Sequence, residues 1–300
     1  MGATTQTTIK APVRLAGVGL HSGSQCRISI LPAPAGSGIV LRRCDIDPDG
    51  ADNRLSTLIH ATPENVVGAD HGTRLANGYG ASVSTVEHLM AALALLSLDN
   101  VMIDVDGPEI PIFDGSAEHL VAGLKQVGVK SQDADRLPIV IGELIRVADG
   151  DRYIEFTPGD TSVIDIDIDF GDCLIGRQTL SVDLESPADR DRLAVSRTFC
   201  RLYEVDGLRR AGLIRGGSLE NSLVVDGQDL LNDQPLRDQH EFALHKALDL
   251  IGDLYLLGRP IRGAIRAVKP GHDLNVRAAL AVARSFSVDA QEARPLAATA

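Results

Sequence analysis

Tryptophan is absent from this sequence, and aromatic residues make up only 3% of it. The core must therefore be built from aliphatic side chains, and few aromatic platforms remain on which nucleic-acid bases could stack. Cations are also in short supply, since 29 lysines and arginines stand against 41 aspartates and glutamates, a formal net charge of −12. Because binding to a phosphate backbone depends on a cationic surface, we expect no nucleic-acid partner.

Cysteine is scarce as well, and long apolar runs are missing. Cys26, Cys44, Cys173 and Cys200 lie far apart and form no Cys-x-x-Cys pair, so neither a disulfide framework nor a thiolate metal site is indicated. No apolar run reaches the roughly 18 residues of a membrane span, and residues 1–10 lack the apolar stretch of a signal peptide. We therefore expect a cytoplasmic protein without a transmembrane segment, and a monomer.

The first half of the chain combines strands with two helices. Asn77-Gly78 is a strong hairpin signal between two short extended stretches. Apolar residues at helical spacing predict a helix over 86–96, and a second helix is expected over 116–126. Alternation and turn residues predict the strands of this half, which are expected over residues 26–30, 38–43, 73–76, 79–83 and 101–105.

The second half repeats this order of elements. Strands are expected over 139–147, 153–157, 163–170, 179–184 and 261–268, and helices over 239–256 and 272–286. We therefore predict an α+β fold of two similar domains, each a β-sheet with two main helices, with the helices sandwiched between the two sheets. The predicted domains span residues 1–130 and 137–290, with a polar junction over 129–136 and a frayed tail over 291–300. A cleft between the halves is the expected site.

A histidine and an aspartate on the long helix of the second half are candidate metal ligands. His245 and Asp249 are four residues apart, so they project from one face of a helix and can bind one ion. The alternative is that they belong to a solvated stripe with Glu241 and Asp253. Against this, apolar neighbours leave only a narrow polar strip on this helix, and such a strip more often faces a cleft than open water.

The pair Glu87-His88, at the start of the equivalent helix in the first half, can supply the third ligand. The imidazole would bind the metal, while the adjacent carboxylate would take a proton from water. The alternative is structural, because Ser84-Thr85-Val86-Glu87 has the pattern of a capping box. Glu118-His119 also begins a helix, but nothing else in the pattern requires it, and we interpret that pair as structural.

His272 lies just after Pro270-Gly271, which breaks the chain before the last helix. A histidine there can act as an acid or an electrostatic partner, or it can simply begin the helix. Both interpretations remain open on these residues alone. Gly17-Val18-Gly19 lacks the third glycine and the strand-to-helix context of a dinucleotide-binding turn.

Several sequence blocks, in order along nearly the whole chain, match those of a known family. The blocks are Gly17-Val18-Gly19-Leu20-His21-Ser22-Gly23, Ser84-Thr85-Val86-Glu87-His88-Leu89, Pro108-Glu109-Ile110-Pro111-Ile112-Phe113-Asp114-Gly115-Ser116, Ser196-Arg197-Thr198-Phe199, Gly216-Gly217-Ser218, His245-Lys246-Ala247-Leu248-Asp249 and Gly271-His272. With these blocks the chain resembles the UDP-3-O-acyl-N-acetylglucosamine deacetylases, which remove an N-acetyl group early in lipid A synthesis.

The resemblance implies a zinc-dependent amide hydrolase, with ferrous iron as the alternative metal. It implies that His88, His245 and Asp249 bind the metal and that Glu87 is the general base. His272 would act as an imidazolium toward the oxyanion or the leaving amine. Asp253 would hold His272 in its charged form, and Thr198 would donate a hydrogen bond to the tetrahedral intermediate.

The resemblance also implies the substrate contacts. Lys246 and Lys269 match residues near the nucleotide diphosphate, and Phe170 and Phe199 match aromatic contacts to nucleotide and sugar. An insert over about residues 202–225, which includes Gly217, would form an apolar passage for the acyl chain. The side chains that could line this passage are Leu208, Leu213, Ile214, Leu219 and Val224.

Three positions depart from the family pattern. Leu219 stands where an aromatic residue is often found, Arg152 replaces a lysine expected near the phosphates, and Gly72 stands where some members carry cysteine. The acyl-length preference and the phosphate contacts therefore stay open. The two rival hypotheses are a non-catalytic nucleotide-sugar-binding protein on the same fold and a zinc amidase with an unrelated substrate.

Overall fold

Two five-stranded sheets with the same strand order form the framework of the protein. The computed structural model describes residues 5–46 and 54–292. The first sheet has the order β2 (Val13–Val18), β3 (Gln25–Pro32), β9 (Val101–Asp106), β4 (Ile39–Arg43), β5 (Leu58–His60). The second has the order β12 (Ile145–Asp149), β13 (Arg152–Thr157), β20 (Ala264–Val268), β14 (Val163–Asp169), β15 (Arg177–Asp183).

In each sheet the central strand is the one that comes last in the sequence. β9 is antiparallel to β3 and parallel to β4, and β20 is antiparallel to β13 and parallel to β14. The two halves are therefore copies of one topology, as the sequence predicted.

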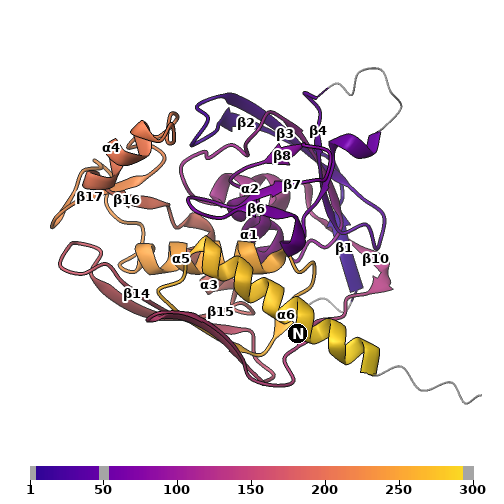
Figure 1. Ribbon diagram of the computed structural model, residues 1–300. Helices are drawn as coiled ribbons and strands as arrows, with labels where there is room; N and C mark the ends of the chain where they lie inside the picture. Colours follow the sequence, from indigo (N-terminus) through magenta and orange to yellow (C-terminus); the bar gives the residue numbers. More distant parts are fainter. Residues whose placement is uncertain (1–4, 47–53, 293–300) are drawn as a thin grey trace, which may run out of the picture.

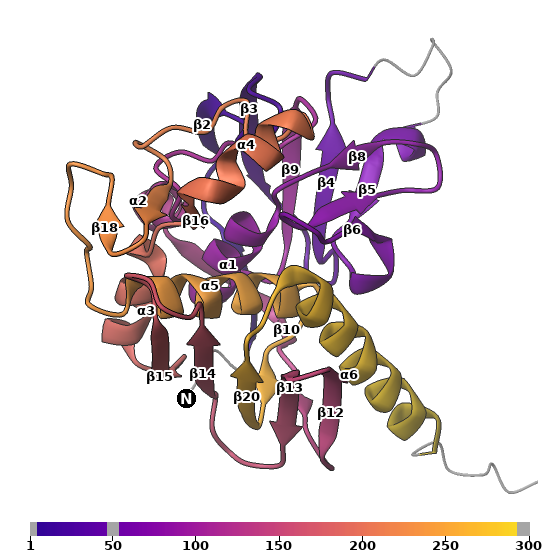
Figure 2. The same cartoon turned by 60° about the vertical axis from the view of Figure 1, so that its left-hand side comes forward.

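Helices fill the space between the two sheets (Figures 1 and 2). The first half contributes α1 (Glu87–Leu95) and α2 (Glu118–Val127), and the second contributes α5 (Glu241–Tyr255) and α6 (His272–Glu292). α1 packs directly on α5, while α6 packs on α5 and β12. The aliphatic core is continuous through both halves, and all but one residue of α5 are buried. This confirms the predicted α+β sandwich.

A glycine permits the close contact between α1 and α5. A Cβ atom at Gly252 would lie 2.1 Å from the backbone oxygen of Glu87 and 3.2 Å from the backbone nitrogen of Ala91. Only hydrogen occupies that space in glycine, so the two helix backbones can touch. The contact brings the start of α1 beside the middle of α5.

Two predicted strands are interrupted. Residues 139–147 form β11 (Ile139–Val140) and β12, with Gly142 between them, and β11 pairs with β19 (Ile261–Arg262). Residues 261–268 form β19 and β20, which are separated by Gly263 at φ +148°. The sequence predicted unbroken strands because the apolar pattern continues on both sides of each glycine. The strands break there because glycine weakens the interior of a strand.

The polar stretch expected as a junction is a strand. β10 (Val129–Asp135) pairs with β1 (Thr5–Ile9) near the N-terminus. The division between residues 130 and 137 remains a proposal, supported by the fact that each five-stranded sheet takes its strands from one side of it. α6 continues to residue 292, and the rest of the predicted tail lies outside the described residues.

The remaining elements lie around this framework. β7 (Arg74–Ala76) and β8 (Ser82–Val83) form the predicted hairpin, although five residues, not two, connect them. β7 also pairs with β6 (Val66–Gly68), and short 3₁₀ turns span Arg54–Thr57 and Pro63–Asn65. The other elements of the second half are α3 (Pro187–Val195), β16 (Phe199–Arg201), α4 (Leu202–Arg210), β17 (Leu223–Asp226) and β18 (Asp229–Leu230).

Candidate active site

The contact between α1 and α5 brings two imidazoles and one carboxylate together. Asp249 Oδ1 lies 3.4 Å from His245 Nε2 and 3.6 Å from His88 Nε2. The two imidazole rings meet edge to face with centroids 5.0 Å apart. One ligand atom from each residue lies within 4.8 Å of the others, and all three residues are buried. These residues could hold a metal ion.

The donor atoms of this group are set up to accept a cation. Asp249 Oδ1 is buried and has no hydrogen-bond partner among the described residues. His245 Nδ1 lies 3.0 Å from the carbonyl oxygen of Ser196, to which it can donate, and Nε2 then carries the free lone pair. Burial lowers the pKa of His245 to about 3, so its ring is neutral at pH 7.

The pKa of Asp249 also favours its ionised form. Burial would raise the pKa of this carboxyl, but the nearby Lys246, His245 and His272 outweigh burial and hold it well below its usual range. The ammonium of Lys246 lies 2.9 Å from Asp249 Oδ2. Two imidazoles and one carboxylate form the donor set that both catalytic zinc sites and ferrous sites use.

Glu87 does not cap its helix. The N-cap of α1 is Val86, without a side-chain cap, and Ser84 instead forms a β-bridge with Glu109. The Glu87 carboxylate accepts a hydrogen bond of 2.9 Å from the backbone N–H of Thr73. Burial raises the pKa of Glu87. The capping-box alternative is therefore wrong, because the chain before Val86 is extended and turns sharply at Thr85, at φ +57°.

His272 faces the same group from the start of α6. Its Nδ1 lies 2.9 Å from Asp253 Oδ2, and its Nε2 lies 3.8 Å from Asp249 Oδ2. Burial alone would lower the pKa of His272, but the charges of Asp253 and Asp249 raise it to about 9. The imidazolium form is therefore favoured at pH 7. His245 is therefore neutral and His272 is charged at pH 7, although both rings lie beside Asp249.

Phe199 lies beside His245 and is itself in contact with Phe170 and Lys246. The Phe199 ring centroid lies 6.2 Å from that of His245 and 5.3 Å from that of Phe170. Lys246 Nζ lies 5.5 Å from the Phe199 centroid. The structure thus places an aromatic pair and a cation beside the predicted metal ligands.

A second basic group lies at the start of α6. Lys269 pairs with Asp151 at 2.7 Å. Arg152 donates to the carbonyl oxygen of Lys269 at 3.2 Å and pairs with Asp273 at 2.7 Å. Arg152 and Lys269 are therefore neighbours, and Lys269 precedes His272 by three residues.

Three predicted site residues have no recorded contact with the histidine and carboxylate group. Thr198 is half-buried and bonds through its backbone N–H to the oxygen of Gly115 at 2.8 Å. Gly217 packs against Leu20, and a Cβ there would lie 3.6 Å from the Leu20 side chain. Leu219 is 50% exposed. Their predicted roles remain proposals.

Comparisons with known proteins support one family. A family model described as LpxC, UDP-3-O-acyl N-acetylglycosamine deacetylase, matches residues 6–284. The chain belongs to this family. A UDP-3-O-acyl-N-acetylglucosamine deacetylase of Phenylobacterium zucineum (strain HLK1) is 44% identical over 296 residues, which are 96% of this chain and 99% of that protein.

Relatives of the same name come from other bacteria. One from Anaeromyxobacter sp. (strain Fw109-5) is 42% identical, with 90% of this chain and 86% of that protein covered. One from Vibrio parahaemolyticus serotype O3:K6 (strain RIMD 2210633) is 41% identical, with 92% and 90% covered. Within the described ranges, no helix of this family member has both the length and the apolar character needed to cross a membrane.

Thr73 and Asn275 belong to the site but were missed from the sequence. The Thr73 backbone N–H donates to Glu87, and its hydroxyl donates to Asp253. Asn275 Nδ2 donates to Asp253 Oδ2 at 2.9 Å. Asn275 follows His272 by three residues on one helix, a spacing that could have revealed it. Thr73 carries no such signal, because its partners lie 14 and 180 residues away.

The comparison pair Glu118-His119 lies outside this group. His119 is half exposed, pairs with Asp114 at 3.4 Å and stacks on Phe113. Glu118 faces Arg237 at 3.4 Å. The structural interpretation of this pair agrees with these surface contacts.

Proposed function

We propose that this protein hydrolyses the N-acetyl group of a UDP-linked 3-O-acyl-N-acetylglucosamine, giving acetate and the free amino sugar, as a step of lipid A biosynthesis. One structural observation supports the proposal in addition to the family membership. The buried group of His88, His245 and Asp249 has a neighbouring carboxylate, Glu87, and a neighbouring imidazole, His272, that is held as the imidazolium at pH 7. Amide hydrolysis requires this combination of base and acid.

We assign the metal site to His88 Nε2, His245 Nε2 and Asp249. The orphaned Oδ1 of Asp249 and the hydrogen bond that orients His245 support this assignment. A divalent cation at this position supplies a Lewis acid and makes water easier to deprotonate near neutral pH. Three protein ligands leave a position open, as in catalytic zinc sites. We propose zinc, with ferrous iron as the alternative that the same donor set accepts.

Glu87 is the proposed general base. Its raised pKa brings the carboxylate closer to the pKa of a useful base at neutral pH. The hydrogen bond from Thr73 N–H fixes one oxygen. The other oxygen approaches Gly72 so closely that a Cβ there would lie 3.0 Å away. The carboxylate is thereby held in one orientation, from which it takes a proton as water attacks the acetamide carbonyl.

His272 is the proposed acid. Its Nδ1 is bound to Asp253, whose second oxygen accepts from Thr73, so the ring is fixed and Nε2 faces the metal ligands. As an imidazolium it stabilises the developing oxyanion and gives its proton to the departing amine when the C–N bond breaks. Asp253 keeps His272 charged, and we propose Thr198 as a further donor to the oxyanion.

The substrate would extend from this centre in two directions. Lys246, Lys269 and Arg152 provide cations for the diphosphate, and Phe170 and Phe199 provide apolar faces for the sugar and nucleotide. We propose that the acyl chain lies along the segment 202–225 that contains Gly217 and Leu219. Leu208, Leu213 and Ile214 of this segment are only partly buried.

The rival of a non-catalytic binding protein is less well supported. Binding a nucleotide sugar does not require a buried base and a buried acid beside a metal site. We retain the cytoplasm as the expected location because all four cysteines are free thiols. The monomeric state remains a prediction.

The decisive experiment measures acetate release from UDP-3-O-acyl-N-acetylglucosamine by the purified protein. Activity should disappear with a chelator and return with added zinc. Glu87→Ala should keep its metal and lose about 100-fold to 10,000-fold in kcat. Glu118→Ala is the matched control, since Glu118 also starts a helix and precedes a histidine, and it should keep its activity. Full activity of metal-free protein, or of Glu87→Ala, would refute the proposal.

A further inference from the structure

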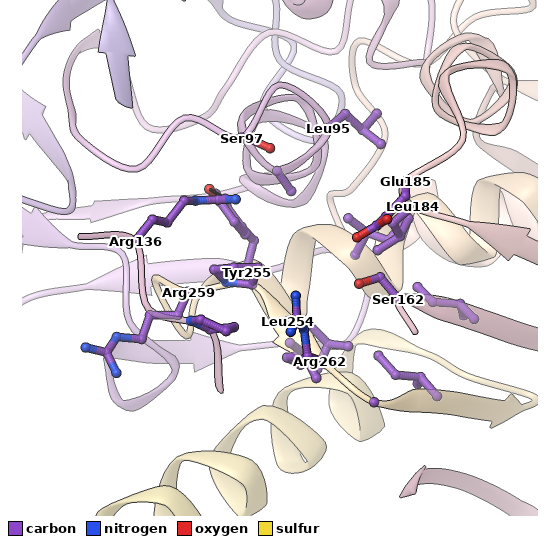
Figure 3. Close-up of a pocket in the computed structure, with 18 of the residues that line it drawn as sticks. Leu95, Ser97, Arg136, Ser162, Leu184, Glu185, Leu254, Tyr255, Arg259 and Arg262 are labelled. Carbon is purple, nitrogen blue, oxygen red and sulfur yellow. Dashed lines mark hydrogen bonds between the residues drawn. The ribbon is translucent and has the colours of Figure 1, made fainter. Parts of the chain in front are cut away.

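A cavity lies between the two halves, away from the histidine and carboxylate group. It has a volume of about 430 Å³, within the range of small-molecule pockets. Leu95 of α1 and Leu254 of α5 contribute to its wall, near the C-terminal end of each helix (Figure 3). His88 instead lies at the N-terminal end of α1, and His245 in the first turns of α5.

The wall of this cavity is mostly aliphatic. Its apolar side chains come from α1, α5, the strands β14, β19 and β20, and the segments that precede β11 and follow β15. Such a surface gives ordered water few hydrogen-bond partners and favours an apolar occupant. The apolar residues that best define it are Leu95, Leu137, Ile164, Leu184, Ile251 and Leu254. Leu137 is also 56% exposed, so the apolar surface continues to the outside.

The charges around the cavity are unequal. Four guanidinium groups line it, against the two carboxyl groups of Asp135 and Glu185. Arg136 is already bound, since it pairs with Asp99 at 2.6 Å and donates to the Tyr255 hydroxyl at 3.3 Å. It therefore contributes little free positive charge to a ligand.

The other three arginines form no ion pair with a carboxylate within residues 5–46 and 54–292. Arg190 donates to the carbonyl oxygen of Leu184, and the Arg259 guanidinium lies 5.2 Å from the centroid of the Phe286 ring. Arg259 and Arg262 lie in the segment that joins α5 to β20, and in Figure 3 Arg262 lies between Tyr255 and Ser162. These guanidinium groups stand beside an apolar cavity in a chain whose net charge is −12. They complement an anionic group attached to a hydrocarbon chain.

We propose that this cavity binds a single-chain anionic amphiphile, with the hydrocarbon chain among the aliphatic residues and the carboxylate or phosphate head on Arg259 and Arg262. The site is separate from the acyl-chain segment 202–225, and its occupation does not depend on the deacetylase reaction. The ligand would contact the C-terminal ends of both α1 and α5, the two helices that also carry the proposed metal ligands.

A photoreactive dodecanoate with a diazirine on its chain tests the proposal. After irradiation of the intact protein, peptide mapping by mass spectrometry should find the label on residues of the cavity wall, such as Leu95, Leu184 or Leu254. Unlabelled dodecanoate and dodecyl phosphate are then used separately as competitors, which distinguishes a fatty-acid head from a phosphate head. Dodecanol and dodecyltrimethylammonium test whether the negative charge is needed.

Variants locate the head group. Replacing both arginines, Arg259→Gln with Arg262→Gln, should weaken dodecanoate binding about tenfold, as expected for two partly exposed ion pairs. Arg27→Gln removes an exposed arginine from β3 of the first sheet, away from the cavity, and should leave binding unchanged. Ser162→Phe, which places a ring in the cavity, should also remove the label from its wall.

Three results would overturn the proposal. One is a label confined to residues 202–225, which would mean that the probe enters only the proposed acyl passage. Another is equal competition by dodecanol or dodecyltrimethylammonium. The third is unchanged binding in the double arginine variant when circular dichroism and melting temperature show that it is folded. Acetate release is not used as a readout, so failure here is distinguishable from failure of the proposed deacetylase function.

Discussion

Gly252→Ala is the substitution that tests most directly how the site is assembled. By helix propensity alone, alanine in the interior of α5 should stabilise the protein by up to about 1 kcal/mol relative to glycine. Packing predicts the opposite. The added Cβ would lie 2.1 Å from the Glu87 backbone oxygen, a separation that real Cβ atoms essentially never show, and the nearby atoms are backbone rather than a flexible side chain.

The size of the effect follows from the required displacement. Non-bonded heavy atoms prefer about 3.5 Å, so α1 and α5 must move apart locally by about 1.4 Å. Overpacking of this kind costs about 1–3 kcal/mol, which offsets the gain in propensity and leaves a net loss of up to about 2 kcal/mol. Metal ligands tolerate only about 0.2 Å, and His88 lies on α1 while His245 lies on α5. We therefore expect weaker metal binding and about 100-fold slower turnover.

Three measurements on one preparation check this expectation: metal content after dialysis, kcat for acetate release, and the free energy of unfolding in urea. Gly207→Ala is the matched control, because Gly207 lies in α4 and a Cβ there meets nothing within 4 Å. That variant should be neutral or slightly more stable and should keep its metal content. If Gly252→Ala binds metal and turns over like the unaltered protein, the α1–α5 contact does not position the site.

Further predictions concern the ligands, a buried ion pair and the thiols. His245→Ala should lose the metal as well as activity, and unchanged metal content would remove it from the ligand set. Glu241→Gln should lower the free energy of unfolding in urea by about 3–5 kcal/mol, because it leaves the buried Arg197 guanidinium without its 2.8 Å carboxylate partner; a loss below 1 kcal/mol would contradict this. Burial raises the pKa of Cys26 to about 12, so at pH 8 only about 1 in 10,000 of its thiols is the reactive thiolate. Iodoacetamide should then modify the exposed Cys44 first, and the rate at Cys26 should rise about tenfold per pH unit.

Local features of the chain were predictable because they depend on neighbours in sequence. The alternation of apolar residues gave the strands, and helical spacing gave α1, α2, α5 and α6 to within a few residues at most ends. The spacing of His245 and Asp249 places them on one helix face whatever the rest of the fold does. The similarity of the two halves was also predictable, because the order of helices and strands can be read directly along the sequence.

Other features depend on contacts between distant segments. His88 reaches Asp249 only because Gly252 lets two helix backbones touch. Helix propensity alone would predict that replacing Gly252 with alanine stabilises the protein, whereas packing predicts that it destabilises it. Thr73 joins Glu87 to Asp253 across 180 residues of chain, and no spacing rule spans such a distance. The capping-box pattern at residues 84–87 was misleading, because pairing with Glu109 holds Ser84 extended.

The chain by itself therefore determined which residues have the chemistry for hydrolysis and on which elements they lie. Only the tertiary structure decided the distances between them, the shifts of their pKa values and the cavity that arginines line. The physical reason is that burial, electrostatic fields and backbone contacts depend on position in space, whereas sequence patterns report only what lies within a few residues along the chain.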